Sequence, residues 1–206
     1  TGVQTCALPI SPLPSFSLTS LAANQEFPAK LVKEKLGNGA SGNKTISQPF
    51  TYTKGQLAIY SVSHSLDGFT PAALNTLLTT GSNTKITLAN PSLAPYGESA
   101  KSYLQAQNLY DTLTAQKRII QAENIGQAFQ YAHTGSVDYG FVAQSQLTAI
   151  KATPDQFYTL APESYPPILQ DGVVISDASV ATDFSNYLRA PAGQQYFSDA
   201  GYLAVD

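Results

Sequence analysis

Hydrophobic positions along the chain follow two patterns, and the alternation between them marks out the predicted elements. Short unbroken apolar runs are typical of buried strands, whereas apolar residues spaced three and four apart indicate helices. The runs that predict strands cover residues 57–60, 85–89, 118–120, 139–143, 157–160 and 168–175. The segments that predict helices cover residues 24–36, 71–78, 97–107, 124–132, 180–189 and 191–200.

Polar and glycine residues at the segment ends support these boundaries. Thr70 precedes Pro71, a cap followed by proline at the first helical position, and Asn124 is a second predicted cap. Strands that alternate with helices imply right-handed crossovers and a mostly parallel sheet. The predicted fold class is therefore α/β, with helices flanking the sheets.

Composition excludes several classes of function. The chain has 206 residues, 43 % of them hydrophobic, which is enough for a packed core. With 11 basic against 14 acidic residues the net charge is −3, so the sequence predicts no nucleic-acid partner. One cysteine and two histidines exclude a disulfide framework and argue against a Cys- or His-built metal centre. We predict no cofactor and no direct metal ligands.

The first residues differ in character from the rest. The chain contains no methionine, and residues 1–25 contain no Lys, Arg, Asp or Glu. Residues 1–10 resemble the translation of a sequencing adapter, so we interpret residues 1–21, Cys6 included, as a non-native or disordered leader. A natural N-terminal arm is the alternative interpretation.

Several motifs that suggest catalysis are better explained structurally. Gly37, Gly39 and Gly42 match a dinucleotide fingerprint but follow a helix instead of a strand. The adjacent Ser63 and His64 lack a nucleophile elbow, and His133 suits the end of a helix. The carboxylates Glu123 and Asp138 lie near strand ends, but nothing fixes them in one cleft. We therefore predict that the protein is not an enzyme.

Two loops carry a more specific signal. Residues 90–97 and 121–125 each join the end of a predicted strand to the start of a predicted helix. The first N–H groups of a helix have no partner within the helix and carry partial positive charge. Two such helix starts at the carboxyl ends of strands can bind an oxyanion without Arg or Lys. The nearest basic residues in the sequence are Lys101, Lys117 and Arg118.

The same region resembles the periplasmic molybdate-binding proteins of bacterial ABC importers. The resemblance covers about residues 21–206 in order, most specifically in 85–147. Its matching stretches are 21–25, 55–61, 89–97, 109–113, 122–128, 135–145, 165–168, 187–191 and 201–202. It implies a type II periplasmic-binding-protein fold with two lobes that close over one oxyanion.

The resemblance also implies a division of the chain. Residues 22–57 and 170–206 would form lobe one, which would lack its first strand because the sequence is truncated before residue 21. Residues 58–169 would form lobe two, and the segments 57–60 and 168–173 would cross the hinge. By this resemblance the oxyanion lies in the cleft between the lobes.

Three positions match the ligand-binding residues of the family. Tyr96 and Ile125 would bind through backbone N–H groups, and Ala22 would offer an N–H where the family often has a serine. Ala143 stands where some members have a ligand tyrosine, so that contact would be missing. Each hydrogen bond to a charged group contributes about 1.5–3 kcal/mol, and this chain would lack two or three of those that the family makes to the anion. We therefore predict that the chain as given binds its oxyanion weakly, without reaching sub-micromolar affinity.

The resemblance implies a biological setting as well. The protein would be the exported, periplasmic and monomeric substrate-binding component of an importer, with a membrane permease and an ATPase as partners. Its ligand would be molybdate or tungstate, which the sequence does not distinguish. The alternative is a ligand-sensing effector domain of a transcription regulator with the same fold, although no helix-turn-helix is visible in the sequence.

Overall fold

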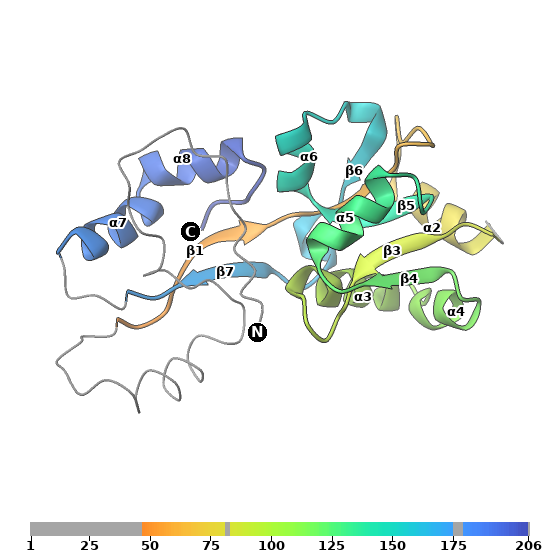
Figure 1. Cartoon of the computed structure of the whole chain (residues 1–206), viewed down its shortest axis with the longest axis horizontal. Coiled ribbons are helices and arrows are strands. Elements are labelled where there is room, and N and C mark those ends of the chain that lie inside the picture. Colours follow the sequence, from red (N-terminus) through yellow and green to blue (C-terminus); the bar gives the residue numbers. More distant parts are fainter. Residues whose placement is uncertain (1–46, 81–82, 175–178, 206) are drawn as a thin grey trace. The chain divides into compact units, whose positions relative to one another are not determined.

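The structure is a computed structural model that describes residues 47–80, 83–174 and 179–205 (Figure 1). The chain divides into two compact units. Unit 1 comprises residues 1–53, 169–195 and 205–206, and unit 2 comprises residues 54–168 and 196–204. The predicted leader, the predicted helix 24–36 and Ala22 lie outside the described residues. Among the described residues, no helix has both the length and the apolar character to cross a bilayer.

Unit 2 contains a five-stranded mixed sheet. Its strands are β2 (Leu57–Tyr60), β3 (Ile86–Ala89), β4 (Ile119–Ala122), β5 (Tyr139–Ala143) and β6 (Phe157–Thr159), in the order β4-β3-β5-β2-β6. β3 pairs parallel with both β4 and β5, whereas β2 pairs antiparallel with β5 and β6. The predicted α/β fold class is confirmed, and the parallel part of this sheet consists of β4, β3 and β5.

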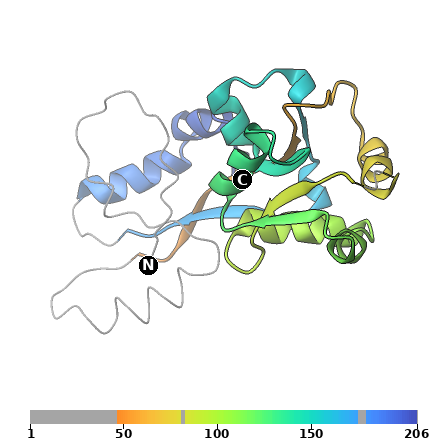
Figure 2. The same cartoon turned by 45° about the vertical axis from the view of Figure 1, so that its right-hand side comes forward.

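Helices cover both faces of this sheet. They are α2 (Pro71–Thr80), α3 (Pro95–Ala106), α4 (Tyr110–Ala115), α5 (Ile125–His133) and α6 (Gln144–Ile150), with 3₁₀ turns at Pro154–Gln156 and Pro162–Ser164. On one face, Leu57 and Leu88 pack against residues of α2, α3 and α4 such as Leu104. On the other face, Ala58 and Val142 pack against residues of α5 and α6. Figure 2 shows α3 and α5 on opposite sides of the sheet.

Alternation along the strands explains the two faces. Successive side chains of a strand point to opposite sides, and in β2 the residues Leu57 and Ile59 enter one cluster while Ala58 and Tyr60 enter the other. All four are at most 1 % exposed. A short, wholly apolar strand is the expected consequence of burial on both faces.

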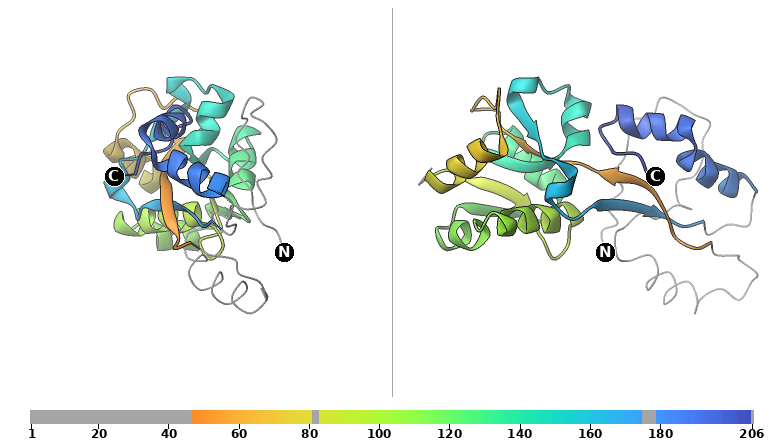
Figure 3. Two further views of the ribbon diagram at one scale, coloured as in Figure 1. Left: turned by 90° about the vertical axis from the view of Figure 1, so that its left-hand side faces the viewer. Right: turned by 180° about the vertical axis from the view of Figure 1, so that it is seen from behind.

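The described part of unit 1 is built around the pairing of β1 (Phe50–Gly55) with β7 (Ile168–Gly172) (Figure 3). The Thr51 hydroxyl donates a hydrogen bond to the Asp171 carboxylate across this pair. Helix α7 (Ser179–Arg189) follows, and α8 (Pro191–Asp199) begins in this unit. The buried Gln194 side chain donates to the Tyr52 and Leu188 carbonyls and accepts from the Val205 N–H.

The C-terminal segment 196–204 belongs to unit 2. Leu203 forms a β-bridge with Lys54, and the Gln56 amide donates to the Gly201 carbonyl over 3.2 Å. The sequence-based division assigned all of 170–206 to lobe one, and that division into lobes stays a prediction. Residues 57–60 lie inside unit 2, whereas the chain passes from unit 1 to unit 2 within β1, between Thr53 and Lys54.

Candidate functional site

The carboxyl edge of the sheet brings two helix starts together. We use this name for the edge formed by Ala89, Ala122 and Ala143, the last residues of β3, β4 and β5. Ala89 pairs directly with Ala122 in the parallel register. The loops that lead into α3 and α5 therefore leave adjacent strands at the same edge (Figure 1). In open α/β sheets, ligands bind outside this edge, where consecutive connections cover opposite faces.

The start of α5 is formed by a local polar network. Asn124 is the N-cap, with extended φ and ψ of −151° and 171°, and its side chain accepts from the Gln127 N–H over 2.9 Å. The Gln127 side chain accepts in turn from the Glu123 N–H over 2.7 Å. Within the part of the chain that the structure describes, neither the Ile125 nor the Gly126 N–H has a hydrogen-bond acceptor. The predicted cap is thus confirmed, and two N–H groups of the first turn stay available.

The start of α3 is shaped by its loop and by a close approach to the sheet. Asn90 accepts from the Ser92 N–H through its side chain and from the Leu93 and Ala94 N–H groups through its carbonyl. Pro95 opens the helix and Tyr96 is its second residue. A Cβ on Gly97 would clash with the Ala89 carbonyl oxygen, so only glycine lets the helix start this close to the strand end.

The Tyr96 ring lies against the segments that enter and leave unit 2. A Cβ built on Gly55 would clash with the Tyr96 hydroxyl and would lie 3.1 Å from a methyl of Ile168. Tyr96 is half-buried there, next to the end of β1 and the beginning of β7. Its backbone is therefore held by α3 and its side chain by these two strands.

The sequence analysis missed Gln146, which links α5 to the end of β5. Its Nε2 donates to the Ile125 carbonyl over 3.2 Å, and its Oε1 accepts from the Ala143 N–H over 3.0 Å. Gln146 lies in α6, a helix that the sequence pattern did not predict. Its position three residues after the end of an apolar strand was the only available signal, because its partner Ile125 is 21 residues away.

Basic side chains in this region are engaged away from the carboxyl edge. Lys101 lies over the Tyr110 ring, with its Nζ 5.3 Å from the ring centroid. Arg118 precedes β4 and donates to the Thr84 and Leu78 carbonyls at the opposite end of the sheet. Two exposed acidic residues, Glu98 and Glu123, adjoin the helix starts. Within the described residues, the candidate donors at this edge are therefore peptide N–H groups and not the side chains of Lys101 or Arg118.

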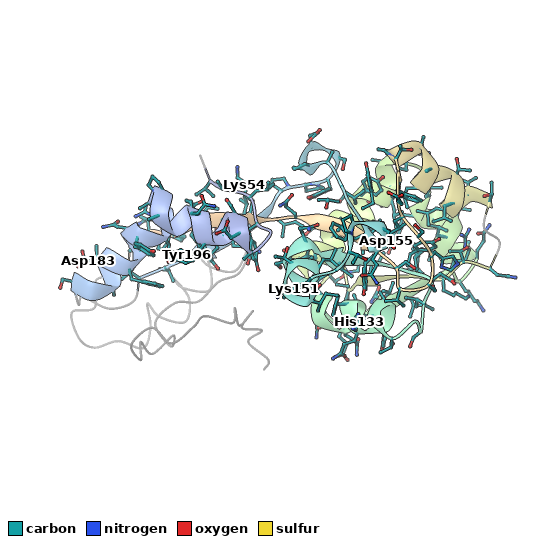
Figure 4. The ribbon with its side chains drawn as sticks, turned by 90° about the horizontal axis from the view of Figure 1, so that it is seen from above. Lys54, His133, Lys151, Asp155, Asp183 and Tyr196 are labelled. Carbon is teal, nitrogen blue, oxygen red and sulfur yellow. The ribbon has the colours of Figure 1, made fainter. Side chains whose placement is uncertain are left out.

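Of the other chemical motifs, Ser63, His64 and His133 form local hydrogen bonds, whereas Gly37, Gly39 and Gly42 lie outside the described residues. The Ser63 hydroxyl lies 2.9 Å from His64 Nδ1 on an exposed turn, where the Ser61 hydroxyl accepts from both of their N–H groups. His133 lies at the far end of α5 (Figure 4). Its Nδ1 lies 2.8 Å from the hydroxyl of the buried Tyr60. No group of three or more potential metal ligands occurs among residues 47–80, 83–174 and 179–205.

Glu123 and Asp138 lie at opposite ends of the sheet. Glu123 follows β4 at the carboxyl edge, whereas Asp138 precedes β5 and accepts from the Lys85 N–H over 2.6 Å. Two carboxylates separated by the length of parallel strands cannot face one cleft as glycoside hydrolysis requires.

Comparison with known proteins identifies the family. Residues 20–203 match the family described as bacterial extracellular solute-binding protein. The chain belongs to this family. The family description is one of solute binding, which agrees with the prediction that the protein is not an enzyme.

Two curated relatives have a more specific name. The molybdate-binding protein ModA of Azotobacter vinelandii is 30 % identical over 186 residues, covering 88 % of this chain and 69 % of the relative. ModA of Rhodobacter capsulatus is 28 % identical over 186 residues, covering 89 % and 68 %. The solved periplasmic molybdate-binding protein of Azotobacter vinelandii superimposes with a TM-score of 0.72 at 26 % identity, covering 91 % of this chain and 79 % of that one.

The predicted ligand residues have different outcomes. Tyr96 and Ile125 both lie at the carboxyl edge, in the first turns of α3 and α5, as the sequence analysis expected. Ala22 lies outside the described residues. That these three residues bind an oxyanion stays a prediction.

Proposed function

We propose that this solute-binding protein delivers molybdate to an ABC importer and holds it through main-chain N–H groups at the starts of α3 and α5. The observation that carries the proposal is the first turn of α5, where the Ile125 and Gly126 N–H groups have no acceptor among the described residues. Tyr96 would contribute from the start of α3, and Ala22 would be the third ligand residue.

The chemistry of the edge favours a small dianion. Helix N-termini concentrate partial positive charge on N–H groups that point outward along the helix axis. Peptide N–H groups are neutral and do not titrate, so a site built from them does not select anions by net charge. Its selectivity would follow from the size of the anion and from the number of hydrogen bonds that the anion accepts. The exposed carboxylates of Glu98 and Glu123 repel anions at long range. An anion that forms no direct hydrogen bonds with the site would therefore not be held here.

The identity of the ligand is proposed from the relatives. Both ModA relatives are molybdate-binding proteins by name, and each is similar to most of this chain. Tungstate has nearly the same size and charge, and we expect it to bind equally well. By the same reasoning the protein would be periplasmic and monomeric, with a permease and an ATPase as partners. The alternative, an effector domain of a transcription regulator, gains no support from these relatives.

Calorimetric titration of the 206-residue chain with molybdate tests the proposal. We expect molybdate and tungstate to bind with similar affinity, more weakly than sub-micromolar, and sulfate and phosphate to bind at least about tenfold more weakly. Binding of all four anions with equal affinity would contradict the proposal, and so would the absence of any molybdate response.

A matched pair of variants tests the Ile125 amide itself. Ile125→Pro removes the N–H at the first helical position, where proline is well tolerated, and the extended Asn124 before it is compatible with proline. Ile125→Ala shortens the side chain but keeps the N–H. We expect Ile125→Pro to lose about tenfold or more in molybdate affinity and Ile125→Ala to lose little. Equal affinities would remove Ile125 from the site.

A further inference from the structure

We propose that Gln146 is a positioning residue of this site, which fixes the Ile125–Gly126 peptide group so that the Gly126 N–H becomes an additional donor to the anion. This inference deepens the proposed function and rests on it. Neither the sequence pattern nor the family resemblance pointed to Gln146 or Gly126.

The contacts of Gln146 span the carboxyl edge. Nε2 donates to the Ile125 carbonyl over 3.2 Å and Oε1 accepts from the Ala143 N–H over 3.0 Å. One half-buried side chain thus ties the first turn of α5 to the last residue of β5. A glutamine can make this bridge because its amide presents a donor and an acceptor side by side.

Peptide planarity transmits this contact to the Gly126 N–H. The Ile125 carbonyl and the Gly126 N–H belong to one rigid unit and point in opposite directions. Holding the carbonyl therefore sets the direction of the N–H, and a hydrogen bond to the carbonyl oxygen also polarises the N–H. Because Gly126 has no Cβ, a ligand can approach this N–H closely.

The other polar side chains of this turn, Asn124 and Gln127, form hydrogen bonds with groups other than the Ile125–Gly126 peptide. Asn124 caps the Gln127 N–H, and Gln127 accepts from the Glu123 N–H. Within the described residues, neither side chain forms a hydrogen bond with the Ile125–Gly126 peptide. Among these side chains, Gln146 is therefore the one that holds this peptide group, in addition to the main-chain hydrogen bond that the Ile125 carbonyl accepts within α5.

The test uses Gln146→Met, which keeps the length and helix propensity of the side chain but removes both hydrogen bonds. Gln146→Glu is a second variant, because a carboxylate still accepts from Ala143 but cannot donate to the Ile125 carbonyl. Gln130→Ala is the matched control, since Gln130 is exposed on the same α5 helix. Molybdate affinity is measured by calorimetry, and backbone amides are followed in proton–nitrogen NMR spectra.

We expect Gln146→Met to weaken molybdate binding about fivefold to tenfold and Gln146→Glu to weaken it about 50-fold or more, with Gln130→Ala unchanged. Molybdate should shift the Gly126 amide proton downfield in the parent chain and less so in Gln146→Met. Parent-like affinity in both Gln146 variants would overturn the inference, as would a Gly126 amide that does not respond to molybdate while the Ile125 amide does.

The spectra of the ligand-free protein separate this inference from the proposed function. There Gln146→Met should move the Gly126 and Ala143 cross-peaks and leave Gly135, beyond the far end of α5, in place. If the parent chain fails to bind molybdate but these shifts occur, the proposed ligand is wrong and the positioning by Gln146 stands. An unmoved Gly126 cross-peak in the ligand-free variant would refute the positioning itself.

Discussion

The two ends of the parallel strands β3, β4 and β5 use polar groups in opposite ways. At the carboxyl edge, the Ile125 and Gly126 N–H groups have no acceptor among the residues that the structure describes, and neutral side chains such as Asn124 and Gln146 organise the turn. At the amino end, charged side chains fill the hydrogen-bonding needs of the backbone. Arg118 donates to the Leu78 and Thr84 carbonyls, and Asp138 accepts from the Lys85 N–H.

In unit 2, the buried positive charge of Arg118 and the proposed anion site therefore lie at opposite ends of the sheet. Arg118 is only 1 % exposed, and its Nη2 has no acceptor within the described residues. Burial lowers the pKa of Arg118 because the charged form is desolvated. Such a group stabilises the fold and cannot reach a soluble ligand, whereas the carboxyl edge has the accessible dipoles.

The largest effect is expected for Arg118→Ala at the amino end. The substitution leaves a cavity and two carbonyls without their donor, so the free energy of unfolding should fall by about 3 kcal/mol. Molybdate affinity of the folded protein should not change, because the site is at the other edge. Urea unfolding and calorimetry measure the two quantities. Lys85→Ala, which removes an exposed hydrogen bond to the Lys117 carbonyl, is the control and should cost less than about 1 kcal/mol.

A smaller loss of stability, but a clear loss of affinity, is expected for Gly97→Ala at the carboxyl edge. The added Cβ would press on the Ala89 carbonyl, a backbone group that cannot rotate away, so the start of α3 must shift. We expect about 2 kcal/mol of destabilisation and about tenfold weaker molybdate binding. Glu98→Ala, at the next and exposed position, should keep full stability. Unchanged affinity in Gly97→Ala would mean that the position of this helix start is unimportant for binding.

Substitutions of Asn124 separate capping from anion binding. Asn124→Ala loses the hydrogen bond from the Gln127 N–H and should cost about 1 kcal/mol. Asn124→Asp keeps an acceptor and should retain stability, but its negative charge should weaken molybdate binding about tenfold. Thermal unfolding and calorimetry distinguish the two effects. If Asn124→Asp binds as tightly as the parent, the anion does not lie near α5.

The smallest effect at neutral pH is expected for Tyr139→Phe, near the amino end. Burial, and then the neighbouring Asp138 carboxylate, raise the pKa of Tyr139. In the unfolded chain tyrosine ionises near pH 10, so the contribution of Tyr139 to stability should be constant below about pH 10 and fall above it, by at most about 1.4 kcal/mol per pH unit. Tyr139→Phe should make this fall shallower. Urea unfolding at a series of alkaline pH values measures the slope, and identical slopes would contradict the assignment.

The elements that the sequence predicted well are those with strong local signals. Thr70 before Pro71 marks the start of α2, and its hydroxyl accepts from the Ala73 N–H over 3.1 Å. Asn124 caps α5 as expected, and the apolar run 139–143 is β5. In each case the deciding contacts lie within four residues along the chain or follow from burial of a continuous apolar run.

The elements that the sequence missed depend on distant partners. β1 reads Phe-Thr-Tyr-Thr-Lys-Gly, with no apolar run, and becomes a strand because it pairs with β7 more than 100 residues later. The short helices α4 and α6 also have no clear periodic pattern over six and seven residues. Such segments adopt regular structure through tertiary packing, which a local pattern does not report.

The α/β fold class, the two strand-to-helix loops and the caps could be predicted from the sequence, because local patterns and contacts between near neighbours set them. Four other features depend on the three-dimensional arrangement: the two loops leave adjacent strands in register, Gly97 must be a glycine, Arg118 faces the opposite end of the sheet, and Gln146 reaches Ile125. Each of these is set by the pairing order of the strands, which brings together residues far apart in the chain.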